Sequence, residues 1–476
     1  MSSGFSERFK EKFENMIVEA MKESHIPGFS VAFVKDGQVL YARGFGARNL
    51  KDNLPATPDT LYGIGSCTKS FTALALMQLV EQGKIDVQDP VSKYLPFKLG
   101  SEENPIRIRH LLTMSSGIPS LGVAELLIGK ATEDMEEKWI PMSSFQDLML
   151  HVNGASEEIA TEPGKRYFYL NTGFTLLGEI VERVSKMPYE QYIKEKILTP
   201  LKMNRSTFLE CEFEKDTDTM TTYIARKKED KLKVIPSRHP FNKFVYAPGG
   251  LLSSVMELTH YLIASIDGGV FEGTRILDES LMSELHKVQF ESEMFRNIYG
   301  TNTVGKAGYG YGWGVIDDFL GHKLLAHGGS TGVSSAELMF VPDLKIGVAA
   351  AANVGGLPRQ VLMGALAYLM GKDPEKEIPY FEIKRKLDML TGEYEFYKGI
   401  HKISVVRKGG LLFLVSKEPG MEINEPLIPE TVKIESYKFY LYGLGTKQPV
   451  EFDIGESGKI DLYIERNHFH KSRSLH

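Results

Sequence analysis

The pattern of apolar residues changes once along this chain, and that change limits what the chain can fold into. Before about residue 370, stretches with helical spacing alternate with strand-like stretches, whereas from about Leu390 short strand-like stretches follow one another without helices. The 476 residues suffice for two or three domains of ordinary size. We therefore predict a mixed domain over 1–375, a linker over 376–389 and a small antiparallel β barrel over 390–476.

The first domain is predicted to belong to the α+β class. Apolar residues recur at helical spacing over residues 5–25, and Phe29–Arg43 has the alternation and the Asp-Gly turn that are typical of a β-hairpin. Thr68–Gln82 is the strongest helical pattern, and Tyr311–Ala351 contains several strand-like stretches. This order predicts an antiparallel sheet flanked by helices, beside a helical region.

The second domain is predicted to be built from strands alone. Lys408-Gly409-Gly410 has the composition of a hairpin turn. The expected strands are Glu393–Tyr397, Ile403–Arg407, Leu411–Val415, Val432–Ser436, Lys438–Tyr442, Val450–Ile454 and Ile460–Glu465.

Composition excludes several functional classes. The 56 Lys and Arg against 62 Asp and Glu give a net charge of −6, which argues against a dedicated nucleic-acid-binding protein. No apolar run approaches the ~20 residues that span a membrane, so no membrane partner is expected. The N-terminal region is charged from Glu7 onward and lacks an apolar signal core. With only Cys67 and Cys211, a disulfide framework is excluded, and we expect a cytoplasmic protein.

One candidate catalytic pair lies at the start of the strongest predicted helix. Ser66 and Lys69 are three residues apart, so their side chains share one helical face and can meet. A buried lysine with a lowered pKa could take the serine proton, and the helix N-terminus could stabilise an oxyanion. The alternative is a capping serine followed by a surface lysine, which is the commoner origin of such spacing.

Two further clusters carry chemically useful side chains. A Tyr169 phenolate could act as a general base if nearby cations lower its pKa, and the Asn171 amide could bond both a lysine and a substrate carbonyl. His327 ends a predicted strand, and the glycines that follow it, including Gly329, would let a substrate backbone approach closely. The alternatives are that the tyrosine only packs within a loop and that His327 only forms a local hydrogen bond at the end of its strand.

The order of the three clusters gives the chain a family resemblance. Ser66-Cys67-Thr68-Lys69, then Tyr169-Leu170-Asn171, then His327-Gly328-Gly329 resemble the three motifs of the serine β-lactamase and penicillin-binding-protein superfamily. The chain is most similar to the class C β-lactamase-like branch, which includes D-aminopeptidases, other peptidases and esterases. Stretches such as "GIGSCTKSFTALALMQLVEQG" and "PGKRYFYLNTGFTLLGEIVE" extend the resemblance over about residues 10–370.

The resemblance implies a role for each motif residue. It implies that Ser66 is the nucleophile that forms an acyl-enzyme and that Lys69 takes part in proton transfer to and from Ser66. Tyr169 would be the general base and then the acid that protonates the leaving group. Asn171 would hold Lys69 and the substrate, and the backbone N–H groups of Ser66 and Ser330 would form the oxyanion hole.

The third motif departs from the lactamase pattern. His327 stands where lactamases and penicillin-binding proteins have a lysine that helps recognise the substrate carboxylate, and histidine is mostly neutral at pH 7. We therefore expect a serine hydrolase that cleaves amide bonds, namely a peptidase that acts on small peptides. The family resemblance adds a preference for D-amino acids as one option. The alternatives are a carboxylesterase or weak β-lactamase using the same site, and a non-catalytic binding protein. Residues 121–159, 212–245 and 271–307 are expected to shape the pocket.

The C-terminal segment carries a second, weaker resemblance. "LTGEYEF" followed by paired strands and "KGGLLFLV" is similar to the lipocalin-like domain of some family members. Archaeal peptidases with this layout form closed octamers, so a homo-oligomer is expected. The sequence has no HExxH, CxxC or P-loop pattern, and neither a metal nor another cofactor is indicated. His468-Phe469-His470 is expected to be part of a solvated tail, because no spaced partner is apparent.

Overall fold

The computed structural model describes residues 5–132, 142–228, 231–299, 305–418 and 421–474. The chain divides into two compact units, Met1–Gly371 and Lys372–His476, and each is described here by itself. Among the described residues, no helix combines the length and the apolar character needed to cross a membrane.

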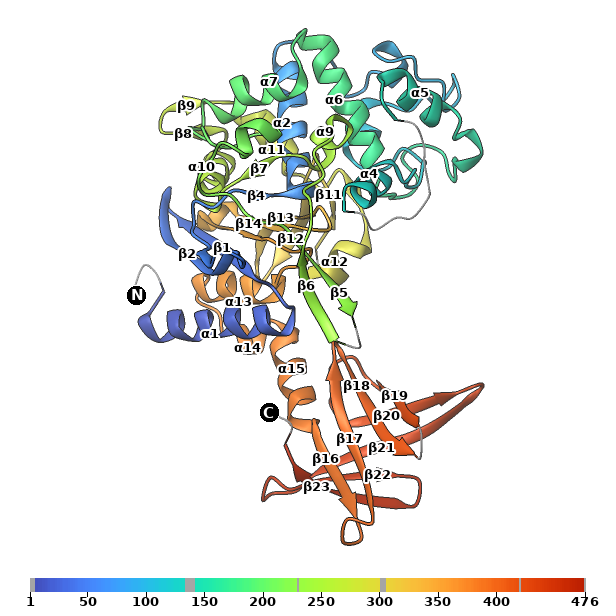
Figure 1. Ribbon diagram of the computed structural model, residues 1–476. Coiled ribbons are helices and arrows are strands. Elements are labelled where there is room, and N and C mark those ends of the chain that lie inside the picture. Colours follow the sequence, from blue (N-terminus) through green and yellow to red (C-terminus); the bar gives the residue numbers. More distant parts are fainter. Residues whose placement is uncertain (1–4, 133–141, 229–230, 300–304, 419–420, 475–476) are drawn as a thin grey trace. The chain divides into compact units, whose positions relative to one another are not determined.

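An antiparallel sheet of nine strands organises the described part of the first unit (Figure 1). The N-terminal strand β1 (Gly28–Lys35) pairs with β15 (Ile346–Ala352), so the two ends of this unit meet at the centre of the sheet. Asp36 and Gly37 both have positive φ, as the predicted hairpin turn requires. In spatial order the other strands are β10 (Phe290–Glu291), β11 (Ala307–Tyr309), β12 (Gly314–Phe319), β13 (His322–Ser330) and β14 (Ser335–Val341) on one side, and β2 (Gln38–Asn49) and β3 (Leu54–Pro55) on the other.

Helices cover both faces of this sheet (Figure 1). On one face lie α1 (Glu7–Glu23), which buries Phe9, Phe13, Ile17 and Met21 at four-residue spacing, and α13 (Arg359–Leu369). On the other face α10 (Val255–Ile266) packs on β1 and β15. Every residue of β14 and β15 is buried, as expected for central strands covered on both faces.

The helical region is built around α2 (Thr68–Glu81). Every residue from Thr68 to Leu79 is buried, so α2 is a core helix and not an amphipathic surface helix. The other α-helices in the described residues of this unit are α3 (Ile108–Leu112), α4 (Val123–Ala131), α5 (Phe145–Asn153), α6 (Asn171–Ser185), α7 (Tyr189–Ile193), α8 (Glu210–Phe213), α9 (Tyr246–Gly249), α11 (Glu279–Leu285) and α12 (Glu293–Tyr299). Short two-stranded pairs are β4 (Tyr62–Gly63) with β7 (Leu252–Ser253), β5 (Tyr223–Lys228) with β6 (Lys231–Pro236), and β8 (Val270–Phe271) with β9 (Thr274–Arg275).

The second unit contains a closed antiparallel barrel. Its eight strands enclose an apolar core that includes Tyr394, Leu412 and Phe452. The strands are β16 (Gly392–Phe396), β17 (His401–Lys408), β18 (Leu411–Glu418), β19 (Met421–Pro429), β20 (Lys438–Gly443), β21 (Thr446–Ile454), β22 (Ile460–Ile464) and β23 (Asn467–Arg473). The α+β class and the antiparallel barrel predicted from the sequence are both confirmed.

Three details of the barrel prediction were wrong. Val432–Ser436 is not a strand, and Val432 is 84% exposed. The prediction missed β19, which contains two prolines and buries only Leu427, and β23, which buries only Phe469. Backbone pairing with neighbouring strands defines β19 and β23, and a search for alternating apolar residues does not detect such pairing.

The segment 376–389, predicted as a linker, is largely helical. It falls within α14 (Pro374–Glu377) and α15 (Pro379–Leu390). Pro374 and Pro379 stand at the starts of these two helices, where the missing N–H costs nothing. Leu387 and Leu390 of α15 are part of the barrel core, so this helix belongs to the second unit.

Candidate active site

Ser66 is the most accessible residue of its neighbourhood. It lies in a short 3-10 turn, η1 (Gly65–Cys67), that leads into α2, and it alone among residues 61–70 is not buried. Gly65 has a φ of +52°, and a Cβ there would come 2.4 Å from the backbone nitrogen of Ser330. Only glycine permits this approach. The turn therefore holds Ser66 next to the end of β13.

Lys69 is fully buried one helical turn after Ser66. Its Nζ lies 2.8 Å from Ser66 Oγ, 2.8 Å from Asn171 Oδ1 and 2.7 Å from the carbonyl oxygen of Pro248. Burial lowers the pKa of Lys69 well below its ordinary value, and the carboxylate of Glu125 opposes this shift. A neutral amine has two N–H groups for the two carbonyl acceptors and one lone pair for the serine hydroxyl proton. The three contacts of Lys69 Nζ match these two donors and one acceptor.

Asn171, the first residue of α6, links Lys69 to a residue that the sequence did not single out. Its Oδ1 accepts from Lys69, and its Nδ2 donates to Glu125 Oε1 at 3.0 Å. These two bonds fix the amide orientation. Glu125 is an exposed residue of α4, and its carboxylate adds negative charge beside the site. Because α4 and α6 are distant in sequence, only the fold reveals this contact.

Tyr169 lies beside the same amine. Lys69 Nζ is 4.7 Å from the centroid of its ring. Burial raises the pKa of Tyr169 above its ordinary value, although a hydrogen bond with Ser66 opposes the shift. The phenol is therefore protonated in the resting site. This direction is opposite to the one that a phenolate base requires.

The end of β13 provides backbone donors beside Ser66. A Cβ on Gly329 would lie 2.7 Å from the backbone nitrogen of Ser66 and 2.0 Å from the carbonyl oxygen of Ile64. Together with the approach of Gly65 to Ser330, this brings the N–H groups of Ser66 and Ser330 to one junction. Two such donors are the elements of an oxyanion hole.

His327 is held by the protein through both ring nitrogens. Its Nδ1–H donates to the carbonyl oxygen of Gly328, and the Tyr309 hydroxyl donates to Nε2, each at 2.8 Å. The side chain is 6% exposed, and burial lowers the pKa of His327 to about 3. His327 is therefore neutral, and it is not among the described residues that line the pocket around Ser66. Tyr309 was not identified from the sequence.

A small pocket surrounds Ser66. Its lining residues come from η1, α4, α6, α9, the end of β13 with the next residue, and the segment 240–245. Two of the regions that were expected to shape the pocket, 121–159 and 212–245, therefore contribute to its wall. Residues 133–141, 229–230 and 300–304 of the expected regions lie outside the described part of the chain. The lining residues are Ser66, Ala124, Ile128, Asn171, Pro240, Val245, Pro248, Gly249, Ser330 and Thr331.

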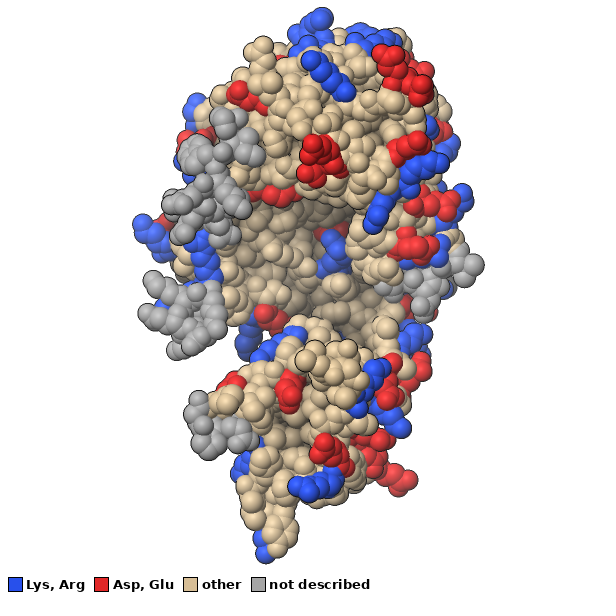
Figure 2. Space-filling model, turned by 90° about the vertical axis from the view of Figure 1, so that its right-hand side faces the viewer, with Lys and Arg blue, Asp and Glu red and all other residues tan. Residues whose placement is uncertain are grey.

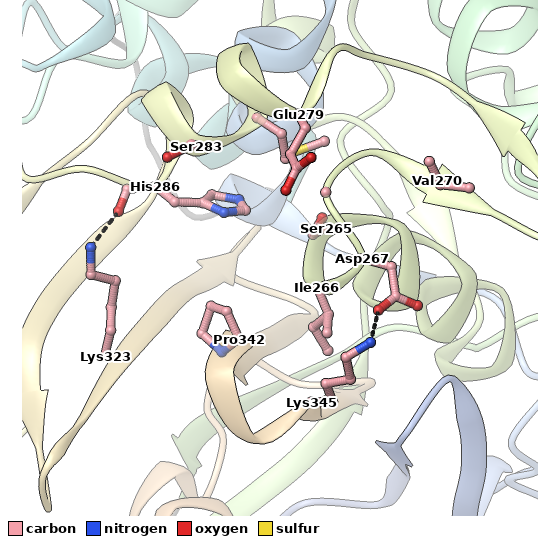
Figure 3. A pocket seen from close by; sticks show the side chains of 12 residues that line it. Ser265, Ile266, Asp267, Val270, Glu279, Ser283, His286, Lys323, Pro342 and Lys345 are labelled. Atoms are coloured by element: carbon pink, nitrogen blue, oxygen red, sulfur yellow. Dashed lines mark hydrogen bonds and ion pairs between the residues drawn. The ribbon is translucent and has the colours of Figure 1, made fainter.

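A larger pocket lies elsewhere in the first unit (Figure 3). Lys323, Lys345 and Glu279 are among its lining residues, and no member of the three sequence motifs is among the described residues that line it. Lys345 is paired with Asp267 at 2.9 Å, and Lys323 contacts the carbonyl oxygen of His286. The motif residues lie instead at the smaller pocket. Ser66, Asn171 and Ser330 line that pocket, and Lys69 contacts Ser66 from the buried side chains next to it.

The fold and the order of the three motifs are those of a β-lactamase-like protein, and comparison with known proteins shows the family. The beta-lactamase family model matches residues 13–369, so the chain belongs to this family. The family model of the Pab87 octamerisation domain matches residues 374–470.

Individual relatives resemble one or both units. The octameric penicillin-binding protein homologue from Pyrococcus abyssi superposes with a TM-score of 0.86 at 40% identity, covering 97% of this chain and 99% of that chain. Penicillin-binding protein 4* of Bacillus subtilis is 25% identical over 94% of both chains. Protein flp of Staphylococcus aureus is 27% identical over 72% of this chain, which spans 63% of that relative's length. The penicillin binding protein from Bacillus halodurans (TM-score 0.56, 23% identity, 75% of this chain and 98% of that chain) shares the fold.

Proposed function

We propose that this chain is a serine peptidase that cleaves amide bonds through an acyl-enzyme at Ser66. The observation that carries the proposal is the environment of Lys69. A fully buried amine lies 2.8 Å from Ser66 Oγ, and its other two contacts are carbonyl acceptors. Burial favours the neutral form of such an amine, and that form can take the serine proton.

In the proposed acylation, Ser66 Oγ attacks the substrate carbonyl carbon, and the hydroxyl proton passes to Lys69 Nζ. The negative charge that develops on the carbonyl oxygen is met by the N–H groups of Ser66 and Ser330. Donors of this kind contribute roughly 2.7–4 kcal/mol each to transition-state stabilisation. Asn171 Oδ1 keeps Lys69 in place throughout.

Tyr169 is proposed as the proton relay to the leaving group. Its phenol is protonated, and its ring lies 4.7 Å from Lys69 Nζ. It gives its proton to the departing amine and regains one from protonated Lys69, so the C–N bond breaks without forming an amide anion. Water then attacks the ester, and its proton follows the reverse route. This assignment differs from the sequence-based expectation, in which Tyr169 is the first base.

The charges around the pocket favour a substrate with a free amino group. Glu125 is exposed, and its bond to Asn171 holds its carboxylate beside a residue that lines the pocket. His327 is neutral and cannot attract a carboxylate as a lysine would. Both features favour an aminopeptidase over a β-lactamase. A preference for D-amino acids stays a prediction from family resemblance.

The second unit supports a proposal about assembly. It matches an octamerisation domain, and the Pyrococcus abyssi homologue, which is similar over both units, is described as octameric. We propose that this chain forms the same kind of assembly, a homo-octamer.

A substrate panel tests the proposed function. The panel pairs aminoacyl amides of L and D configuration with their N-acetylated forms, aryl esters and nitrocefin, and Ser66→Ala provides the background rate. We expect turnover of the free-amine amides, abolished in Ser66→Ala. Turnover of esters alone would assign a carboxylesterase instead. No turnover of any substrate above the Ser66→Ala background would favour a binding protein.

A further inference from the structure

Three potential metal ligands gather on the outer surface of the barrel. In β23, Phe469 is 2% exposed and faces the barrel core, so its neighbours His468 and His470 both project outward. Asp461 of β22 stands directly opposite His470 in the strand register. Its sequence neighbours Ile460 and Leu462 are buried, so Asp461 also projects outward. The three side chains therefore share one face of one hairpin.

The distances between these side chains suit a small coordination sphere. Asp461 Oδ1 lies 2.6 Å from His470 Nδ1, and Asp461 Oδ2 lies 3.4 Å from His468 Nε2. One ligand atom from each of the three residues lies within 4.8 Å of the others. Ligands held tetrahedrally at about 2.0–2.2 Å from zinc are roughly 3.3–3.6 Å apart. Modest side-chain rotation reaches that arrangement.

The surroundings hold the ligands in place. Tyr463 stacks on the His468 ring, with centroids 4.5 Å apart and planes inclined by 11°. On its other edge β23 pairs with β16 and so closes the barrel. Lys459 Nζ lies 3.4 Å from Asp461 Oδ1, which makes it the cation that an incoming metal would displace. Sites on paired strands are better fixed than sites on loops.

We propose that Asp461, His468 and His470 form a binding site for a divalent transition-metal ion, with Zn²⁺ as the principal candidate. Two imidazoles and one carboxylate are ligands that zinc accepts, whereas Mg²⁺ and Ca²⁺ prefer oxygen ligands alone. The three residues leave a fourth position open to water. The bound ion would tie β22 to the strand that closes the barrel. The sequence alone suggested a solvated tail, because Asp461 becomes a partner only when the hairpin forms.

Zinc titration of the full-length, tag-free protein tests this proposal. Isothermal titration calorimetry after chelator treatment is expected to give one Zn²⁺ per chain and no heat of binding with MgCl₂. Loss of a residue that only supports a metal ligand typically weakens metal affinity roughly 10–100-fold. His468→Asn and Asp461→Asn each remove a proposed ligand itself, so each is expected to weaken Zn²⁺ affinity at least as much. Lys459→Met is expected to strengthen binding.

Controls separate this site from other zinc ligands. His322→Asn breaks a second His–Asp pair, in which Nδ1 lies 2.6 Å from Asp343, and is expected to leave zinc binding unchanged. All variants carry Cys211→Ser, because that thiol is exposed. His468 is 43% exposed, so its replacement leaves the folded barrel intact, which circular dichroism verifies. Absent binding in the parent, or equal affinity in parent, His468→Asn and Asp461→Asn, would overturn the proposal.

Discussion

At the scale of single residues, the account depends on which group holds a proton. Burial lowers the pKa of Lys69 and raises that of Tyr169, which favours the neutral amine and the protonated phenol. We expect kcat/KM to rise with pH through the lowered pKa of Lys69 and then to level off. Lys69→Met is expected to lower kcat about 10²–10⁴-fold, the usual contribution of a general base, in steady-state assays. Activity close to that of the parent would show that another group accepts the proton.

Glu125 supplies a second residue-scale prediction. Its charge raises the pKa of Lys69, so Glu125→Gln is expected to move the acidic limb of kcat/KM to lower pH. The same change removes the proposed partner of the substrate amine. KM should rise for free-amine amides and stay unchanged for their N-acetylated forms. Glu102→Gln, which alters another exposed carboxylate, is the matched control. An equal effect on both substrate types would contradict the proposed role of Glu125.

At the scale of elements, the decisive contact is the approach of the turn before α2 to the end of β13. Gly65→Ala would place a Cβ 2.4 Å from the backbone nitrogen of Ser330, at a φ of +52°. We expect kcat to fall about 10²–10³-fold, as for loss of an oxyanion donor.

Gly83, at the end of α2, is the matched control for Gly65. Its φ is +67°, and no other group lies within 4 Å of the position that a Cβ would take there. Gly83→Ala is expected to cost about 1–2 kcal/mol of stability and to leave kcat unchanged. Comparison of kcat with the unfolding temperature of both variants separates the two effects. Similar losses of kcat in both would mean that strain alone, and not the junction with β13, explains the result.

The elements also show what the sequence could and could not predict. The three-residue spacing put Ser66 and Lys69 on one helical face, and the order of the three motifs then favoured a catalytic pair over a capping serine. Glu125, Pro248 and Tyr309 were missed because they contact the motif residues from elements that are distant in sequence or joined only by the fold. Strand β23 was missed because a single buried residue, Phe469, gives no alternation to detect. Local patterns predict elements, whereas contacts between distant elements need the fold.

At the scale of the whole molecule, one face can be examined for charge in Figure 2. On the face shown in Figure 2, Lys and Arg side chains alternate with Asp and Glu side chains and form no large patch of one sign. This distribution agrees with the net charge of −6 and gives that face no basic surface for nucleic acid.

The first unit is expected to lose stability in mild acid. Burial lowers the pKa of His286 and of His327 to about 3, below the ordinary value near 6.5. Between those values the unfolded chain binds more protons, so stability falls as pH falls, by about 1.4 kcal/mol per pH unit for each histidine. Thermal unfolding followed by tryptophan fluorescence reports on this unit, since both tryptophans precede residue 371. An unfolding temperature unchanged between pH 7 and 5 would contradict the expectation.

The proposed assembly predicts the mass of the particle. Light scattering coupled to size-exclusion chromatography is expected to give eight times the 53.4 kDa chain. Removal of the barrel unit should abolish that mass, because the octamerisation domain family matches residues 374–470. A mass equal to one chain for the full-length protein would contradict a homo-octamer.

The most direct test of the central claim is identification of the acylated residue. The protein is treated with a fluorophosphonate or a penicillin-type acylating probe, digested and sequenced by mass spectrometry, with Ser66→Ala and Cys67→Ser in parallel. The account predicts one adduct, on Ser66, retained in Cys67→Ser, absent in Ser66→Ala and much slower to form in Lys69→Met. An adduct on another residue, or labelling of Ser66→Ala at the parent rate, would contradict it.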